Sequence, residues 1–571
     1  MKVVEDAKQA VQGAASAVMA KAVQMAPDSW MPGGKPDPLI RAQHGHIGRP
    51  VSRVDGPVKV RGAAPYAAEF PLDGMLYASL VFSTVAKGTI SALDTTAAEA
   101  APGVALVMSY RNAPRMKPMP LFMTAEKACG GNDLPVMQDA KVYWNGEPVA
   151  LVLAETQEQA DHAAALIHVA YEEEHAVTAL AEAKAKSGAK NAAAVVLDLR
   201  DGGVVASASV PTYDPSVWSE GVSQGEYERL TTGDRSPLID RVTGVAQPPA
   251  STFKAVTLPG AVAAGADLDD EVNCTASHRI GDRTFNNFES RAYGWITWRE
   301  AIKVSCDTVF YRVADRVWRD QGGLSGDDAG DPLISTARDL GLGAPTGIDL
   351  PAESSGRIPD REWKREWWRT TKDASCRAAK RGHPEVEDRT ERAYLTALER
   401  DNCRSGYQFR PGDEVNLSIG QGDVTATLLQ MAQVYGTIAT GGTEPSPHLG
   451  RSTIAPDGRR TRLDAPATRE VDLPGESGSL LRSALGDVVD RPGGTARSAF
   501  AGFPLRQWPV AGKTGTAEVY GKEDTAWFVS YAPTTRPRYV VAVVVSQGGT
   551  GGGTAAPIAR AIHEDLAGVD D

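Results

Sequence analysis

Cysteine and histidine are scarce in this chain, and neither is arranged for a metal site. The five cysteines are spread over 571 residues without a C-x-x-C pair, which argues against a disulfide scaffold and against a cysteine metal site. The nine histidines include no H-E-x-x-H, and the pair His44 and His46 stands apart from other ligand types. We therefore expect no metal and no cofactor.

Positive charge in excess and long apolar runs are also missing. A formal net charge of −12 argues against a nucleic-acid partner, whose binding surface would be basic. There is no run of about 18 apolar residues, so no transmembrane helix is expected. Residues 1–30 mix Lys, Glu and Asp with Ala and Val, and they lack the apolar stretch of a signal peptide. They read instead as a short amphipathic helix.

The composition that remains is typical of a soluble globular protein, with 42% hydrophobic and 23% charged residues. Residues 46–180 have an α+β pattern. Strands are expected at 76–82, 103–110 and 147–155, and an amphipathic helix at 157–172. Residues 179–194 are small and polar, which is typical of a linker or boundary.

The pattern changes after this boundary. Residues 193–209 predict a hairpin that turns at Asp201-Gly202-Gly203. Residues 361–403 are dense in charge and tryptophan and read as an inserted helical region. The chain closes with two strong strands, 525–533 and 538–547, and a helix at 557–568.

The stretch AGKTGTAEVYG, residues 511–521, reads as a strand that carries polar residues where apolar ones are usual. Lys513 supplies a positive charge, Thr514 and Thr516 supply hydroxyl donors, and Gly515 would let a ligand approach the backbone. This pattern predicts an anion-binding strand edge. A solvated edge strand is the alternative, because tripeptide matches are common.

A nucleophile with its base is found upstream. Ser251 and Lys254 stand three positions apart at the head of an apolar run, where a helix start would place them on one face. A buried lysine has a lowered pKa and can take the serine proton. A helix-capping serine with a surface lysine is the alternative. The same S-x-x-K spacing occurs at residues 187–190, but this stretch lies in a Gly- and Lys-rich junction without a helix, so we reject it. In the helix expected after Ser251, Pro259-Gly260 predicts a kink after two turns.

A third motif, Ser305-Cys306-Asp307, precedes another helix-like apolar run. It would supply a proton relay, and a helix cap is again the alternative. Each motif is weak alone. Their order, S-x-x-K, then S-x-[ND], then K-T-G, is typical of β-lactamases and penicillin-binding proteins and favours a serine acyl-transfer site.

From about residue 191 to its end the chain resembles the transpeptidase domain of class B penicillin-binding proteins, of the penicillin-binding protein 2 type. Ala250 stands where that family usually has glycine, and Asp307 where many members have asparagine. The resemblance implies an antiparallel five-stranded sheet flanked by helices, with an all-helical subdomain. The resemblance to this family rests on six stretches of the sequence: PPASTFKAVT, FNNFES, VSCDTVFYRVA, GLGAPTGIDLPAESSGRIPD, NLSIGQGDVTATLLQMAQVYGTIATGGT and VAGKTGTAEV.

The resemblance also implies the chemistry. Ser251 would attack the D-Ala-D-Ala amide of a peptidoglycan stem peptide, with Lys254 as its base. Ser305 would relay the proton to the leaving D-alanine, and Asp307 would position this relay. An E-x-x-L-N deacylation motif of class A β-lactamases is only approximated at Glu414, far downstream of the second motif, and we take it as chance.

The strand at 511–517 would then hold the substrate. Lys513, Thr514, Gly515 and Thr516 would bind its terminal carboxylate, and the N–H groups of Ser251 and Thr516 would form the oxyanion hole. Implied ligands and partners are stem peptides, β-lactams, which acylate the same serine, and a glycosyltransferase of the elongation machinery. The implied location is the cell envelope, at the outer face of the plasma membrane.

The N-terminal part resembles a different family. IGRPVSRVDGPVKVRGAAPYAAEFP and VYWNGEPVALVLAETQEQADHAA are similar to the a/b hammerhead domain of molybdenum-binding subunits of the xanthine dehydrogenase and aldehyde oxidase family. The large domains that hold molybdopterin in that family do not follow. The expected organisation is a helix and arm at 1–45, a hammerhead-like domain at 46–187, a junction at 188–192 and a transpeptidase domain at 193–571 with an insertion at about 355–413.

Two alternatives to a transpeptidase remain open from the sequence: an incomplete molybdenum hydroxylase fragment, and a penicillin-binding module without access to substrate. The junction between the two resembling parts fits three origins of the chain: a natural fusion, a gene-model or assembly artefact, and a deliberate chimera. In the insertion, Cys376 and Cys403 would form a disulfide or stay free thiols. Its tryptophans, Trp363, Trp367 and Trp368, fit a helical lid packed inward better than a surface for a partner or lipid.

Overall fold

The computed structural model describes residues 74–85, 88–116, 136–142, 146–173, 188–213, 222–233, 236–326, 330–454, 460–519 and 521–568. The helix expected in residues 1–30 and the pair His44 and His46 lie outside these ranges. Within them, no helix combines the length and the apolar character needed to cross a bilayer.

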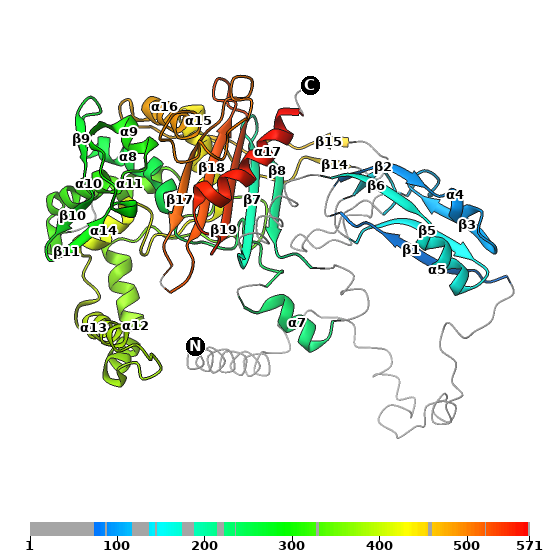
Figure 1. Cartoon of the computed structure of the whole chain (residues 1–571), viewed down its shortest axis with the longest axis horizontal. Coiled ribbons are helices and arrows are strands. Elements are labelled where there is room, and N and C mark those ends of the chain that lie inside the picture. The colour runs from blue at the N-terminus through cyan, green and yellow to red at the C-terminus, as the bar shows by residue number, and fades with distance from the viewer. Residues whose placement is uncertain are drawn as a thin grey trace, which may run out of the picture. The chain divides into compact units, whose positions relative to one another are not determined.

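The first described part consists of two small antiparallel sheets with two helices (Figure 1). One sheet has the order β1-β5-β3, and its strands fall on the three predicted stretches. The second has the order β4-β2-β6. The elements are β1 (Tyr77–Phe82), β2 (Gly88–Asp94), α4 (Thr96–Glu99), β3 (Val104–Ser109), β4 (Lys141–Val142), β5 (Pro148–Ala154), α5 (Gln157–Ala165) and β6 (His168–Glu173).

The helix predicted over 157–172 is wrong in its second half. The helix α5 ends at Ala165, and β6 follows at His168–Glu173. Exposed and half-buried side chains alternate from His168 to Tyr171, which is the period of a strand. Pairing decides the outcome, because Tyr171 lies opposite Ile90 of β2 and Val169 opposite Leu93.

The second described part is built on a five-stranded antiparallel sheet with the order β17-β18-β19-β7-β8. This confirms the predicted fold class. The strand β7 comes from the start of this part and pairs with β19 near the end of the chain, in the register Tyr539 opposite Asp198. The strands are β7 (Asn191–Asp198), β8 (Val204–Val210), β17 (Ala511–Ala517), β18 (Thr525–Ala532) and β19 (Tyr539–Ser546).

Both faces of the sheet are buried, which explains the long apolar run of β19. Val540, Ala542 and Val544 belong to one hydrophobic cluster, and Val541 and Val543 to another. The first cluster includes residues of α8, α10, α11 and α15, and the second includes residues of α17 (Figure 1). Strands that are covered on both faces lose the polar alternation of a half-exposed strand.

The other elements surround this sheet. The helices are α7 (Gln224–Thr231), α8 (Lys254–Ala263), α9 (Trp298–Lys303), α10 (Asp307–Asp320), α11 (Pro332–Asp339), α14 (Pro411–Ser418), α15 (Leu428–Thr440), α16 (Ser477–Asp490) and α17 (Ala556–Gly568). The short strands pair as β9 (Glu271–Cys274) with β12 (Gly294–Thr297), β10 (Ser277–Ile280) with β11 (Arg283–Asn286), β13 (Thr443–Glu444) with β16 (Arg469–Glu470), and β14 (Ser452–Ile454) with β15 (Arg460–Arg462).

The helix α8 continues through Pro259 to Ala263, so the proline does not end it. At Gly260 a Cβ atom would lie 2.9 Å from Leu333 Cδ2 and 3.1 Å from the Pro332 carbonyl oxygen. Glycine therefore allows α11 to pack closely on α8. This tertiary contact was not visible in the sequence.

The charged insertion contains α12 (Arg361–Arg381) and α13 (Arg389–Ser405), joined by a disulfide between Cys376 and Cys403. Trp368 packs inward, since its indole N–H donates to the Asn402 carbonyl. Trp363 and Trp367 stack on each other, but Trp367 is 50% exposed. The prediction of inward-facing tryptophans therefore holds for Trp368 and is wrong for Trp367.

Candidate active site

Ser251 lies in a single 3-10 turn, η5 (Ala250–Phe253), that leads directly into α8. Ala250 begins this turn with a φ of +52°, a conformation that glycine adopts at less cost. This explains why glycine suits the position. The Ala250 N–H donates to the Gly420 carbonyl at 2.8 Å, and a Cβ at Gly420 would lie 2.5 Å from Phe253 Cβ. The loop after α14 thus supports the serine turn from behind.

Lys254 is the first residue of α8 and is fully buried. Its Nζ donates to Asp307 Oδ1 at 2.6 Å, to the Ser305 carbonyl at 2.7 Å and to Ser305 Oγ at 3.0 Å. Burial lowers the pKa of Lys254, and the Asp307 carboxylate opposes this shift. The lysine is therefore both desolvated and paired with a carboxylate.

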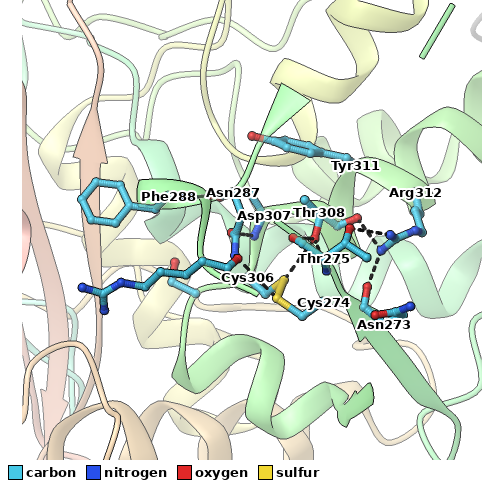
Figure 2. Close-up of a disulfide and its surroundings, with 12 residues drawn as sticks. Asn273, Cys274, Thr275, Asn287, Phe288, Cys306, Asp307, Thr308, Tyr311 and Arg312 are labelled. Carbon is cyan, nitrogen blue, oxygen red and sulfur yellow. Dashed lines mark hydrogen bonds between the residues drawn. A yellow bond between two sulfur atoms is a disulfide. The ribbon is translucent and has the colours of Figure 1, made fainter. Parts of the chain in front are cut away.

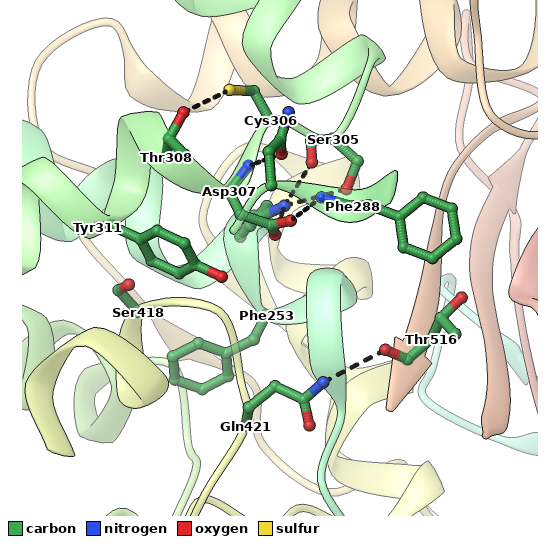
Figure 3. Close-up of polar contacts among 12 residues, drawn as sticks. Phe253, Phe288, Ser305, Cys306, Asp307, Thr308, Tyr311, Ser418, Gln421 and Thr516 are labelled. Carbon is green, nitrogen blue, oxygen red and sulfur yellow. Dashed lines mark hydrogen bonds and ion pairs between the residues drawn. The ribbon is translucent and has the colours of Figure 1, made fainter. Parts of the chain in front are cut away.

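The second motif bends sharply before a helix. Ser305 has a φ of +59°, Cys306 is the N-cap residue, and α10 begins at Asp307. Cys306 also forms a disulfide with Cys274 (Figure 2). Asp307 is held by its Oδ2 atom, which accepts a hydrogen bond from the Phe288 N–H at 3.2 Å (Figure 3).

Lys513 approaches Ser305 from the sheet. Its Nζ donates to Ser305 Oγ at 2.8 Å and to the Thr514 carbonyl at 3.0 Å, and the side chain is fully buried. Burial, and then the charge of Lys254, hold the pKa of Lys513 well below its ordinary value, against the effect of Asp307. The Ser305 hydroxyl therefore lies between the two buried lysines and accepts a hydrogen bond from each. The Asp307 carboxylate supplies the negative charge that favours the charged form of both lysines.

The strand β17 lies at the edge of the sheet, as predicted. Thr514 Oγ1 is 2.6 Å from Thr495 Oγ1, and Thr516 Oγ1 accepts a hydrogen bond from the Gly551 N–H at 3.3 Å. The Thr516 carbonyl accepts from Gln421 Nε2 at 3.3 Å (Figure 3). Both threonine side chains are thus oriented by neighbouring segments.

Gly515 makes a close contact that the sequence did not predict. The sequence suggested that it lets a ligand approach the strand. In the structure, a Cβ at Gly515 would lie 2.8 Å from the Pro249 carbonyl oxygen and 3.1 Å from Thr252 Cγ2. The glycine therefore lets β17 pack directly against the turn that carries Ser251.

We expect Gly515→Ala to lower the rate of acylation by a fluorescent penicillin about 10- to 100-fold, because it pushes the serine turn away from the strand and misplacements of about 1 Å cost this much. No reacting group is removed. The rate would be measured by gel fluorescence over time. Gly486→Ala is the matched control, since a Cβ there meets no atom within 4 Å. Equal rates for the two variants would contradict this role of Gly515.

These elements enclose a cleft of about 780 Å³. Ser251, Ser305, Asp307, Thr514 and Thr516 line it, so residues that are far apart in the sequence meet at one place. Lys254 and Lys513 lie buried beside it and reach Ser305. The described residues contain no group of three or more His, Cys, Asp and Glu placed to hold a metal.

Residues 192–564 match the family described as the penicillin-binding protein transpeptidase domain. The chain belongs to this family. A second model, the a/b hammerhead domain of aldehyde oxidase and xanthine dehydrogenase, matches residues 61–175.

Relatives of the transpeptidase domain agree with this assignment. The chain is 30% identical over 404 residues to peptidoglycan D,D-transpeptidase MrdA of Haemophilus influenzae, which covers 66% of this chain and 53% of the relative. The crystal structure of Pseudomonas aeruginosa PBP2 in complex with WCK 5153 has a TM-score of 0.52 and 27% identity, covering 68% of this chain and 76% of that one.

A chain in a structure of a peptidoglycan synthase complex that coordinates polymerization and crosslinking has a TM-score of 0.53 and 30% identity, covering 69% of this chain and 60% of that one. The chain spans about half the length of the curated relatives it matches.

Several residues of the transpeptidase domain that touch this cleft were not predicted. Thr495 and Gln421 bond the strand residues, Glu518 lines the cleft with a pKa raised mainly by burial, and Asn287 contacts Asp307. Gln421 lies between two glycines in IGQGD, which was one available signal. The disulfide between Cys274 and Cys306 was also missed.

Proposed function

We propose that residues 193–571 form a peptidoglycan D,D-transpeptidase domain that works through a serine acyl-enzyme on Ser251. The observation that carries the proposal is the cleft in which Ser251, Ser305 and the strand residues Thr514 and Thr516 meet beside two buried lysines. The relatives named peptidoglycan D,D-transpeptidases support the same reaction.

In the acylation step, Ser251 Oγ forms a bond to the carbonyl carbon of the penultimate D-alanine. The C–N bond to the terminal D-alanine breaks, and that amine leaves with a proton. Lys254 takes the serine proton, and Ser305 delivers a proton to the leaving amine. The amine of a second strand then attacks the ester, Ser251 regains its proton, and a cross-link remains.

Lys254 must be neutral to act as a base, yet its contact with Asp307 favours the charged form. The structure offers a path for the proton, because Ser305 Oγ lies within 3.0 Å of both Nζ atoms. A substrate carboxylate beside Thr514 and Thr516 would raise the lowered pKa of Lys513. In our proposal, substrate binding therefore moves the proton from Lys254 through Ser305 to Lys513.

The remaining assignments follow from the same placement. The N–H groups of Ser251 and Thr516 would form the oxyanion hole, since β17 is an edge strand and strand edges leave N–H groups without a strand partner. Lys513, Thr514 and Thr516 would bind the terminal carboxylate. Gly515 supports this carboxylate binding because it lets β17 pack against the turn that carries Ser251.

Stem peptides are the proposed substrate, and β-lactams are proposed to acylate the same serine. We also propose a glycosyltransferase of the elongation machinery as a partner and the outer face of the plasma membrane as the location, in line with the synthase complex noted above. Residues 46–187 would be a separate hammerhead-like module, joined at 188–192. No observation favours a molybdenum hydroxylase over this function.

Incubation of the purified chain with a fluorescent penicillin, followed by peptide mapping, tests the proposal. We expect one labelled peptide, the one that contains Ser251, because Ser251 is the proposed nucleophile and lines the cleft. Parallel incubation with a peptide ending in D-Ala-D-Ala and an amine acceptor should release D-alanine and form the transfer product, measured by mass spectrometry. A folded chain that carries no label would refute the function.

A further inference from the structure

A disulfide crosses the second motif of the proposed active site. Cys306 is the middle residue of Ser305-Cys306-Asp307, and its partner Cys274 is the last residue of β9 (Figure 2). Both cysteines are fully buried. The bond therefore ties the turn between Ser305 and Asp307 to a separate strand.

Asn287 holds the same turn from a second direction. Its Oδ1 accepts a hydrogen bond from the Asp307 N–H at 2.9 Å, and its Nδ2 donates to the Arg291 carbonyl at 2.6 Å and lies 3.6 Å from Cys274 Sγ. The next residue, Phe288, donates its N–H to Asp307 Oδ2 (Figure 3). The side chain of Asn287 is buried, so these contacts are shielded from water.

Reciprocal hydrogen bonds reinforce the connection beside the disulfide. The Thr275 N–H donates to Thr308 Oγ1 at 3.1 Å, and this hydroxyl donates to the Thr275 carbonyl at 2.9 Å. Arg312 donates to Thr275 Oγ1 at 2.7 Å (Figure 2). The segment that follows β9 is thus attached to the first turn of α10 at several points.

The turn needs such support because Ser305 has a φ of +59°, a left-handed conformation that a serine adopts only at a cost in energy. Two buried lysines also meet at its hydroxyl. We propose that the Cys274–Cys306 disulfide and Asn287 form a clamp that positions Ser305 and Asp307, so that the acylation rate depends on this disulfide. The inference rests on the proposed function.

The second disulfide provides a matched control for the test. The Cys274→Ala/Cys306→Ala variant opens a loop of 32 residues, and Cys376→Ala/Cys403→Ala opens one of 27 residues in the helical insertion. The loss of loop constraint in the unfolded chain is similar for loops of similar length. We expect comparable falls in melting temperature, but an acylation rate lowered at least about 10-fold only for the first variant.

The pH dependence of acylation separates positioning from general destabilisation. Lys254 faces Asp307 of α10 and Lys513 of β17, and Tyr311 of α10 and Glu518 also lie within the electrostatic reach of Asp307. Asp307 raises the pKa of Lys254 against burial. When the clamp is opened and Asp307 moves away, that support weakens, so the acid limb of the acylation rate should shift to lower pH.

The outcomes are distinct. A wild-type chain without label would refute the proposed function and leave no rate to compare. A labelled wild type whose clamp variant acylates at the control rate, with an unmoved acid limb, would overturn the clamp. If the clamp variant does not fold, Asn287→Ala decides instead, because it keeps both disulfides and removes the acceptor of the Asp307 N–H. We expect it to show the same fall and the same pH shift.

Discussion

Ser251→Ala is expected to abolish covalent labelling by fluorescent penicillin and to lower D-alanine release by about 10⁴-fold or more, since removal of a serine nucleophile has effects of this size. The variant keeps the cleft, both buried lysines and the residues of β17 that are proposed to bind the substrate carboxylate. Ser251 is partly exposed in its turn, and no hydrogen bond of its hydroxyl is found among the described residues. We therefore expect the free energy of unfolding to change by less than about 0.5 kcal/mol.

Peptide mapping and a thermal melt would measure both effects. Ser187→Ala is the matched control, because Ser187 and Lys190 repeat the S-x-x-K spacing in the Gly- and Lys-rich junction. It should label at the wild-type rate. Persistent labelling of a folded Ser251→Ala chain would show that the nucleophile is elsewhere.

Lys254→Met should lower acylation by about 10³-fold, within the range for loss of a general base. It should also destabilise the fold by about 3 kcal/mol, because it leaves the nearly buried Asp307 carboxylate without its closest cation. Acylation would be followed by stopped-time gel fluorescence and unfolding by denaturant titration. Methionine keeps the length of the side chain, so packing changes are small.

A second change separates the two effects. Lys254→Met/Asp307→Asn also removes the Asp307 charge that Lys254→Met leaves without its closest cation, so stability should recover while acylation stays low. Lys364→Met removes another largely buried lysine, which lies in α12 of the insertion and pairs with Asp413 of α14 and with Asp423. It should lose stability but acylate normally. Recovery of acylation in the double variant would exclude Lys254 as the base.

The parts that the sequence predicted well are those in which local pattern and burial agree. The runs at 525–533 and 538–547 are mainly apolar because both faces of β18 and β19 are covered, and they could be recognised as strands without a partner. The three site motifs were recognised for another reason. Their order along the chain is typical of penicillin-binding proteins, and the structure brings the three motifs together beside one cleft, while the roles of their residues stay a proposal.

The parts that were missed depend on contacts between distant segments. The stretch from His168 to Glu173 became a strand because β2 lies beside it, although its composition suits the end of a helix. Nothing local links Cys274 with Cys306, or Asn287 with Asp307. The sequence also could not show that Pro249 and Thr252 lie against Gly515.

The strand order of the five-stranded sheet has a consequence for how the protein folds while it is synthesised on the ribosome. The strand β7 emerges early, but its partner on one side is β19, which is synthesised almost at the end of the chain. Until then β7 has β8 as its one strand partner within this sheet. Contacts between segments so distant form slowly. Ser251 in η5 is therefore translated long before Lys513 in β17. In the proposed function, acylation has to wait until β17, β18 and β19 have been translated and have closed the sheet.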